Sequence, residues 1–346
     1  MEIFVYRKGA PSVEEDFTEK DLPALLADKT NVVWVDFLAD TPEQTEQAKR
    51  ILTNVFKFHH LTVEDCMETR NQPKVEAFPD YLYLIVHGVK PEETHSANFV
   101  TKELDAFLGE NFVVTHHVER FRSVKIVKQQ IRNNNFACQR GAAYLLHQIL
   151  DQIVDLYMPI VEDFDSTINE LEDRAFQMKN GDNEILEEIM GLRRSVARLK
   201  RISTRQLDIL YRISHGEFPQ IPENILPFYR DVQDHLLRIS DLSENYRDLV
   251  SGLFDIHFSV VANKTNDILK FLSIFSAIWL PLSFLAGVFG MNTKLFPDDQ
   301  TWSNLIYIFS VMMLIALLLI FYFWRKGWIL QDESKAGQES GKQVEN

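Results

Sequence analysis

The sequence predicts an α/β domain, then a long all-α stalk and two C-terminal transmembrane helices. Short β-rich runs alternate with helical patterns over residues 1–120, and Leu, Ile, Glu, Lys and Arg dominate from residue 121 onward. Two uncharged apolar runs lie at residues 271–290 and 305–324. A chain of 346 residues can hold two or three domains, and its 46% hydrophobic content supplies a core as well as the spans.

The predicted α/β domain, residues 1–120, consists of short hydrophobic runs separated by turn residues. Pro42 begins a predicted helix over residues 42–56. The expected strands lie at residues 3–6, 31–37, 81–89, 101–108 and 111–115. Cys66 and Cys138 are far apart and outside any Cys-x-x-Cys pair, so they indicate neither a disulfide framework nor a structural zinc site.

Residues 121–222 form a predicted helical region with an acidic helix pair. We expect one helix over residues 142–178, bent near Pro159, and a second over residues 183–212. The carboxylates of this pair fit a solvated face. Attraction of cations near a pore mouth is the alternative.

Residues 223–290 predict one long helix that enters the membrane. No proline lies between Pro227 and Pro281, and Gly252 is the one glycine in that stretch. At about 1.5 Å per residue, a helix of about 60 residues extends about 95 Å. Such a helix needs partners along its length.

The two apolar runs are each long enough to cross a membrane. About 20 helical residues span the hydrocarbon core, so the loop at residues 291–304 must lie on the far side from both termini. Arg325 and Lys326 follow the second run, whereas the loop carries Lys294 against Asp298 and Asp299. The positive-inside rule therefore places both termini, including the tail at residues 325–346, in the cytoplasm.

Charge and motif content exclude several classes of protein. The net charge of −14 argues against binding to nucleic acid, whose phosphates require a basic face. The chain has no phosphate-binding loop, nucleophile elbow or metalloprotease helix, so we expect neither an enzyme nor an organic cofactor. The acidic balance favours cations.

Small and weakly polar residues recur on one face of the first span. Steps of three and four residues give Asn266, Leu269, Ser273, Ser276, Leu280, Ser283, Gly287 and Gly290. Close helix packing in a bilayer would explain such a stripe. The other explanation is a narrow water-filled pore, with Leu269 and Leu280 as apolar constrictions. Because a single two-span hairpin cannot enclose a pore, the second explanation requires a homo-oligomer.

The same region resembles a known family. Residues 264–292, KTNDILKFLSIFSAIWLPLSFLAGVFGMN, closely resemble the pore helix of the CorA metal ion transporters, with that family's motif at Gly290, Met291 and Asn292. Residues 59–76, 228–236 and 245–255 are similar to family segments in the expected order. Phe289 departs from the tyrosine that the family usually carries.

The resemblance implies a funnel-shaped homopentamer in the cell (inner) membrane that conducts Mg²⁺, with Co²⁺ and Ni²⁺ as further substrates. Mg²⁺ dehydrates reluctantly, so a ring of Asn292 carboxamides and carbonyls near Gly290 could select the hydrated ion. Membrane potential would drive influx. The implied pore positions are Asn266, Leu269, Leu272, Leu280, Ser283 and Gly287, and the stripe adds Ser273 and Ser276.

Two further sets of carboxylates are expected to interact with cations. Asp298 and Asp299 could concentrate cations at the external entrance, or merely solubilise the loop. In the family, cytoplasmic Mg²⁺ bound between neighbouring subunits closes the channel. Asp231 matches the family's aspartate on the long helix, and Asp80 is the candidate partner on the α/β domain.

Two alternatives stay open. A zinc transporter resembling ZntB would share the architecture, and zinc favours nitrogen and sulfur ligands. The histidine pairs at residues 59–60 and 116–117 fit ordinary surface or core roles better than such sites. A membrane-tethered sensor or scaffold would need neither the stripe nor the motif.

Overall fold

The computed structural model describes residues 1–69, 72–91, 98–134, 136–177, 183–291 and 301–328. By its internal contacts the chain divides into two units, Met1–His257 and Phe258–Asn346. The long helix α9 (Leu226–Phe289) contributes residues to both units.

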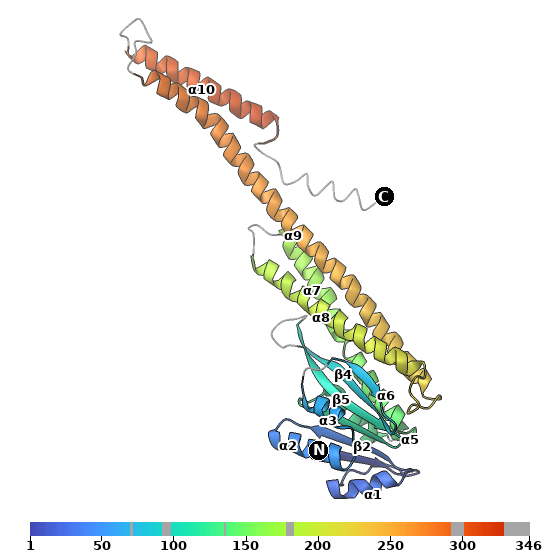
Figure 1. The fold of residues 1–346 in the computed structure, drawn as a ribbon. Helices are drawn as coiled ribbons and strands as arrows, with labels where there is room; N and C mark the ends of the chain where they lie inside the picture. The colour runs from blue at the N-terminus through green and yellow to red at the C-terminus, as the bar shows by residue number, and fades with distance from the viewer. Residues whose placement is uncertain (70–71, 92–97, 135, 178–182, 292–300, 329–346) are drawn as a thin grey trace. The chain divides into compact units, whose positions relative to one another are not determined.

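A six-stranded mixed sheet forms the centre of the first unit, in the order β1-β2-β6-β5-β4-β3 (Figure 1). Among the described strands the pair β2 and β6 is parallel, and the other four pairs are antiparallel. The strands are β1 (Glu2–Tyr6), β2 (Val32–Leu38), β3 (Lys74–Ala77), β4 (Tyr81–Pro91), β5 (Phe99–Gly109) and β6 (Phe112–His117). All five predicted strands are confirmed, and β3 is an additional edge strand.

Helices cover both faces of this sheet because the strand side chains alternate between two hydrophobic cores. Trp34, Leu84 and Ala106 face one core, and their neighbours Val35 and Tyr83 face the other. The first core is closed by α4 (Arg122–Asn133), α5 (Phe136–Gln139) and α6 (Ala142–Asp155). The second is closed by α1 (Leu22–Ala27), α2 (Pro42–Asn54) and α3 (His60–Met67), after a short 3-10 turn at Glu19–Asp21.

Local sequence explains where α2 begins. The Thr41 hydroxyl accepts a hydrogen bond from the Gln44 amide, and the Gln44 side chain accepts one from the Thr41 amide. This capping box satisfies two of the free donors at a helix start, and Pro42 at the first helical position lacks the donor that would be unpaired there.

The predicted bent helix over residues 142–178 is wrong in one respect. It is two helices, α6 and α7 (Met158–Gln177), separated at residues 156–157. Pro159 lies in the first turn of α7, where its missing N–H costs no helical hydrogen bond. Proline therefore marks a helix start here and not a bend within one helix.

A three-helix layer of α7, α8 (Asn183–Ser214) and the first part of α9 extends the first core. Tyr229, Val232, Leu236 and Ile239 of α9 are buried at steps of three and four residues, as one helix face requires. Lys200 of α8 donates to the carbonyl oxygen of Ser240 at 3.3 Å, which ties α8 to α9.

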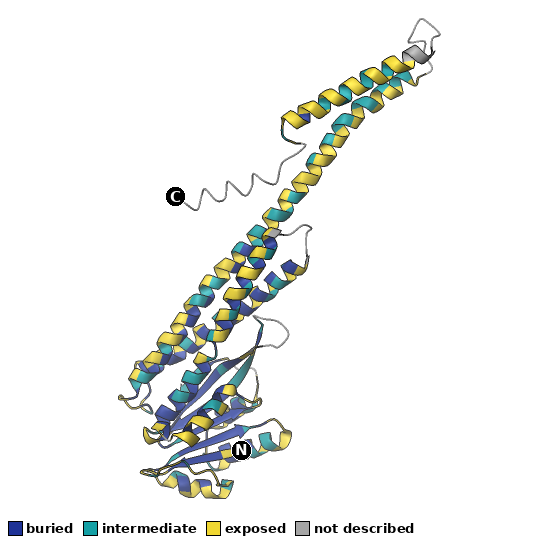
Figure 2. Cartoon of the chain, turned by 180° about the vertical axis from the view of Figure 1, so that it is seen from behind, coloured by how far each residue is buried: buried dark blue, intermediate teal, exposed yellow. Residues whose placement is uncertain are grey.

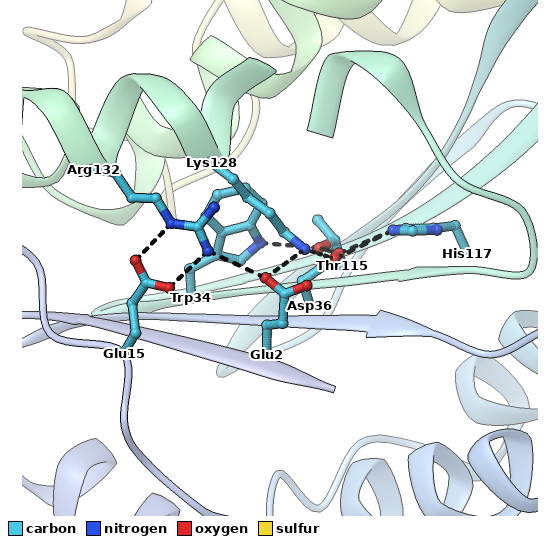
Figure 3. A network of polar contacts seen from close by, with 8 residues as sticks. All are labelled: Glu2, Glu15, Trp34, Asp36, Thr115, His117, Lys128 and Arg132. Carbon is cyan, nitrogen blue, oxygen red and sulfur yellow. Dashed lines mark hydrogen bonds and ion pairs between the residues drawn. The ribbon is translucent and has the colours of Figure 1, made fainter. Parts of the chain in front are cut away.

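A buried polar network joins the parallel strand pair to α4 (Figure 3). Asp36 is 2% exposed and accepts hydrogen bonds from Thr115 and from Lys128 Nζ at 2.5 Å, while His117 Nε2 lies 3.2 Å away. Trp34 in turn donates to the Thr115 hydroxyl. Burial alone would raise the pKa of Asp36, but His117 and Lys128 hold that pKa well below its usual value.

The same network reaches the N-terminal strand through the next turn of α4. Arg132 donates two hydrogen bonds to the carboxylate of Glu15, each 2.7 Å long, and lies 3.7 Å from Glu2 (Figure 3). A two-pronged arginine pair of this kind fixes orientation as well as distance.

Candidate functional site

The second unit contains the candidate ion pathway. It comprises the part of α9 after His257 and α10 (Thr301–Arg325), and α10 lies alongside the end of α9 in both views (Figures 1 and 2). Both helices contain a window long and apolar enough to cross a membrane, and no described residue in either window is buried. These surfaces are suited to lipid and to other copies of the chain.

The two helices pack through one face each. On α9 the half-buried residues recur at steps of three and four, and on α10 they do the same. The α9 set is Ile274, Ala277, Ile278, Pro281, Leu282, Leu285, Val288 and Phe289. The α10 set is Ile308, Val311, Met312, Ile315, Ala316 and Leu319, with buried Phe323 at the end.

The predicted pore residues lie on the other side of α9. At 3.6 residues per turn they fall within roughly a third of the helix circumference, and that third does not include the α10-facing set. All are exposed, and Leu269, Leu272 and Leu280 are 52%, 56% and 71% exposed. The full exposed set is Asn266, Leu269, Leu272, Ser273, Ser276, Leu280, Ser283 and Gly287.

The motif begins where α9 ends. Gly290 follows the last residue of α9, and its amide donates to the Ala286 carbonyl at 2.9 Å. A Cβ at this position would lie 3.0 Å from that carbonyl oxygen, so only glycine fits without a backbone shift. Met291 is 59% exposed. Asn292, Asp298 and Asp299 lie outside the described residues.

A second candidate site lies in the first unit, between α6 and α9. Potential ligand atoms of Asp151, Asp155 and His235 all lie within 4.8 Å of one another. Asp231 is one turn before His235, and its charge is felt at Asp151. We call these four residues the α6/α9 cluster. Burial, and then the charges of Asp155 and Asp231, raise the pKa of Asp151 to about 6.

The structure therefore places Asp231 near Asp151 and one helical turn from His235, residues that the sequence interpretation did not name. Asp151 and Asp155 are four residues apart on α6, and Asp231 and His235 are four apart on α9. Two such pairs, each on one helix face, were the available signal. Asp80 is exposed in the turn between β3 and β4 and does not belong to the cluster formed within one chain.

The chain combines an α/β unit with two apolar helices, the end of the long helix α9 and α10. This combination defines a two-span membrane protein. The model of the family described as CorA-like Mg²⁺ transporter protein matches residues 29–326. A Bacillus subtilis protein named "Putative metal ion transporter YfjQ" is 30% identical over 89% of this chain and 94% of its own. The cobalt/magnesium transport protein CorA of Thermotoga maritima is 28% identical over 92% of this chain and 90% of its own.

The fold agrees with these sequence matches. The complete structure of the CorA magnesium transporter from Methanocaldococcus jannaschii superposes with a TM-score of 0.79 at 20% identity, covering 95% of this chain and 99% of that one. The chain belongs to the CorA-like Mg²⁺ transporter family. It is a membrane-bound divalent metal ion transporter with two C-terminal transmembrane helices, and not an enzyme.

Proposed function

We propose that five copies of this chain form a channel for Mg²⁺ influx, with Co²⁺ and Ni²⁺ as further substrates. The observation that carries the proposal is the small-residue stripe on α9, which α10 leaves uncovered. Relatives named as magnesium or cobalt/magnesium transporters support the choice of ion. Several copies around an axis would enclose this stripe and leave the bulky faces to lipid.

Selection of the ion is assigned to the end of α9. Mg²⁺ keeps its waters, so neutral oxygen dipoles around an aquo ion discriminate without trapping it. Asn292 supplies a carboxamide from each copy, and Gly290 lets the backbone turn beside the Ala286 carbonyl. Met291 packs next to them.

The remaining pathway residues attract cations or gate the pore. Asp298 and Asp299 attract cations to the external mouth, and Leu269 and Leu280 form apolar constrictions that gate by dewetting. No described residue in either apolar run is charged, so no proton relay is available within them. Two charges moving inward gain about 4.6 kcal/mol per 100 mV of inside-negative potential.

Regulation is assigned to the first unit, placed in the cytoplasm by the basic flanks of the spans. Mg²⁺ bound by the α6/α9 cluster, which includes Asp231, with Asp80 reaching from a neighbouring copy, holds the subunits in the closed arrangement. The three carboxylates of the cluster explain why the site would loosen without a cation, because they repel one another.

The test is Mg²⁺ uptake into proteoliposomes under an inside-negative potential. We expect Asn292→Ala to abolish selective Mg²⁺ flux. Ser276→Leu should reduce flux at least tenfold by filling the stripe, whereas Ser310→Leu on the exposed side of α10 should leave it unchanged. Unaltered flux in both stripe and motif variants would contradict the proposal.

The same assay separates the alternatives. Zinc flux without magnesium flux would identify a zinc transporter, and the absence of any divalent flux in intact oligomers would favour a tethered scaffold. Uptake that increases when internal Mg²⁺ is lowered, and that ceases to respond in Asp231→Asn, would support regulation by cytoplasmic Mg²⁺.

A further inference from the structure

Three potential metal ligands of different chemistry meet inside the sheet of the first unit. Asp105 of β5 and His116 of β6 are paired across adjacent strands, and Cys66 of α3 packs over the same face. They are 3%, 1% and 2% exposed, respectively. A thiol sulfur, an imidazole nitrogen and a carboxylate oxygen from these residues all lie within 4.8 Å of one another.

His116 is the anomaly in this group. Neither of its ring nitrogens makes a hydrogen bond, although the side chain is almost completely buried. Its Nδ1 is 3.6 Å from Asp105 Oδ2, beyond hydrogen-bonding distance. A buried polar atom without a hydrogen-bond partner is destabilising, so native structures normally provide one.

The adjacent His117 is also buried, but both of its ring nitrogens have polar partners. Its Nδ1 lies 2.8 Å from the Glu119 carbonyl oxygen and its Nε2 lies 3.2 Å from Asp36. Because the two histidines alternate across β6, they face opposite sides of the sheet. Only His116 faces Cys66 and Asp105.

Asp105 is already oriented for a ligand. The Tyr83 hydroxyl donates to Asp105 Oδ1 at 2.6 Å, which fixes the carboxylate and leaves Oδ2 toward His116. Metal-binding carboxylates are commonly held by a hydrogen bond of this kind to their other oxygen. Tyr83 is fully buried, so this arrangement is a built part of the core.

The three residues also line a cleft that an ion could enter. The cleft has a volume of about 660 Å³, and its polar walls include Glu68, Glu103 and three arginines of α8. Water from this space, or one of the two glutamates, supplies a fourth ligand to an ion held by the three side chains. A site that can be loaded requires such an entry path.

We propose that Cys66, Asp105 and His116 bind one ion of the Zn²⁺ class, meaning Zn²⁺, Co²⁺ or Ni²⁺. Sulfur, nitrogen and oxygen ligands together select such ions, whereas Mg²⁺ takes oxygen ligands in octahedral geometry. Tetrahedral ligand atoms around zinc lie roughly 3.5 Å apart, and His116 Nδ1 and Asp105 Oδ2 are already 3.6 Å apart. The site is separate from the ion pathway and does not depend on transport.

The test uses Co²⁺ as a spectroscopic probe on purified, metal-free, full-length protein in detergent. One equivalent of Co²⁺ should produce a thiolate-to-cobalt charge-transfer band, which Zn²⁺ abolishes and a thousandfold excess of Mg²⁺ does not. The variant Cys138→Ser, which removes the other buried thiol, should keep the band because Cys66 is then the only cysteine. Cys66→Ser should lose it.

Two results would overturn the proposal. Absence of the band in Cys138→Ser, which leaves the three ligands untouched, would show that no metal binds through Cys66. Persistence of the band in Cys66→Ser would place the ion elsewhere. Zn²⁺ should also raise the Tm of the unsubstituted protein and of Cys138→Ser, but not of Asp105→Asn or His116→Gln, which keep the thiol.

Discussion

The two halves of α9 differ in how far their side chains are buried within the chain. Before Phe258, a regular stripe from Tyr229 to His257 is buried by the rest of the first unit, and the Tyr229 hydroxyl donates to the Ala143 carbonyl at 2.8 Å. After His257, none of its described residues is buried (Figure 2). The first half is therefore stabilised by packing within the first unit, whereas the second half packs one face against α10 and leaves its other faces exposed, as suits contact with lipid.

Substitutions in the two halves of α9 should therefore be detected by different measurements. Changes in the first half should appear as loss of folding free energy. Changes in the second half should appear in ion flux, with little effect on the unfolding of residues 1–257.

The largest expected contrast uses one substitution at two leucines of the same helix. Leu236→Ala removes a fully buried side chain and should lower the free energy of unfolding of the first unit by about 2–5 kcal/mol. Leu272→Ala, at a side chain 56% exposed, should change it by less than about 0.5 kcal/mol and alter flux instead. Urea unfolding in detergent measures the first effect and proteoliposome uptake the second.

Equal destabilisation by the two substitutions would break the comparison. It would mean that the exposed face of the second half of α9 also depends on packing within its own chain.

A pair of glycines offers the next contrast. Gly290→Ala forces a Cβ to 3.0 Å from the Ala286 carbonyl oxygen and should reduce Mg²⁺ flux at least about tenfold, or about 1.4 kcal/mol in the barrier. Gly252→Ala meets nothing within 4 Å in the middle of α9. It should leave flux unchanged and raise stability by about 0.5–1 kcal/mol, because alanine loses less backbone entropy.

These two glycine variants are measured by uptake and by thermal unfolding in parallel. If Gly290→Ala conducts normally, the close approach at the end of α9 does not matter to the pathway.

The smallest expected effect is the pH dependence of metal stabilisation at the α6/α9 cluster. The pKa of Asp151 is raised to about 6, chiefly by burial and then by Asp155. Its folded-state pKa lies above that of an ordinary aspartate, so without metal the contribution of this group to stability falls as pH rises through about 4–6. Mg²⁺ bound at the cluster, as proposed, would relieve the repulsion above that window, whereas a proton would compete with it below.

We therefore expect Mg²⁺ to raise the Tm by a few degrees at about pH 7.5 and by almost nothing near pH 5. Asp151→Asn should remove the difference, and Asp173→Asn, at an exposed carboxylate of α7, should retain it. A Mg²⁺ response that is independent of pH would place the stabilising ion at another site.

Much of the fold was predictable because its signals are local. Five strands, the long helix and both spans follow from periodicity and length. The strand β3 was missed because Lys-Val-Glu-Ala is short and only half-buried at a sheet edge. The break between α6 and α7 was missed because the helical pattern continues through it, and Pro159 fits a helix start as well as a bend.

The candidate sites also differ in how far the sequence could predict them. The stripe on α9 is visible in sequence because its residues share one helix face. The ligands of the α6/α9 cluster come from helices about 80 residues apart, and Cys66, Asp105 and His116 come from a helix and two strands. The two i, i+4 pairs of the α6/α9 cluster are visible in the sequence, but no spacing shows that these pairs meet each other, because the topology of the fold brings them together.

The network around Asp36 can form only after a certain length of the chain has been synthesised. Its hydrogen bonds between elements join residues 79 to 117 positions apart, so the parallel strand pair cannot be joined to α4 and the N-terminal segment until Arg132 has been synthesised. At about 5–20 residues per second, roughly 7–28 s then pass before the first apolar run at residue 271 is made. The sheet thus has time to close while the nascent chain is still free of the membrane.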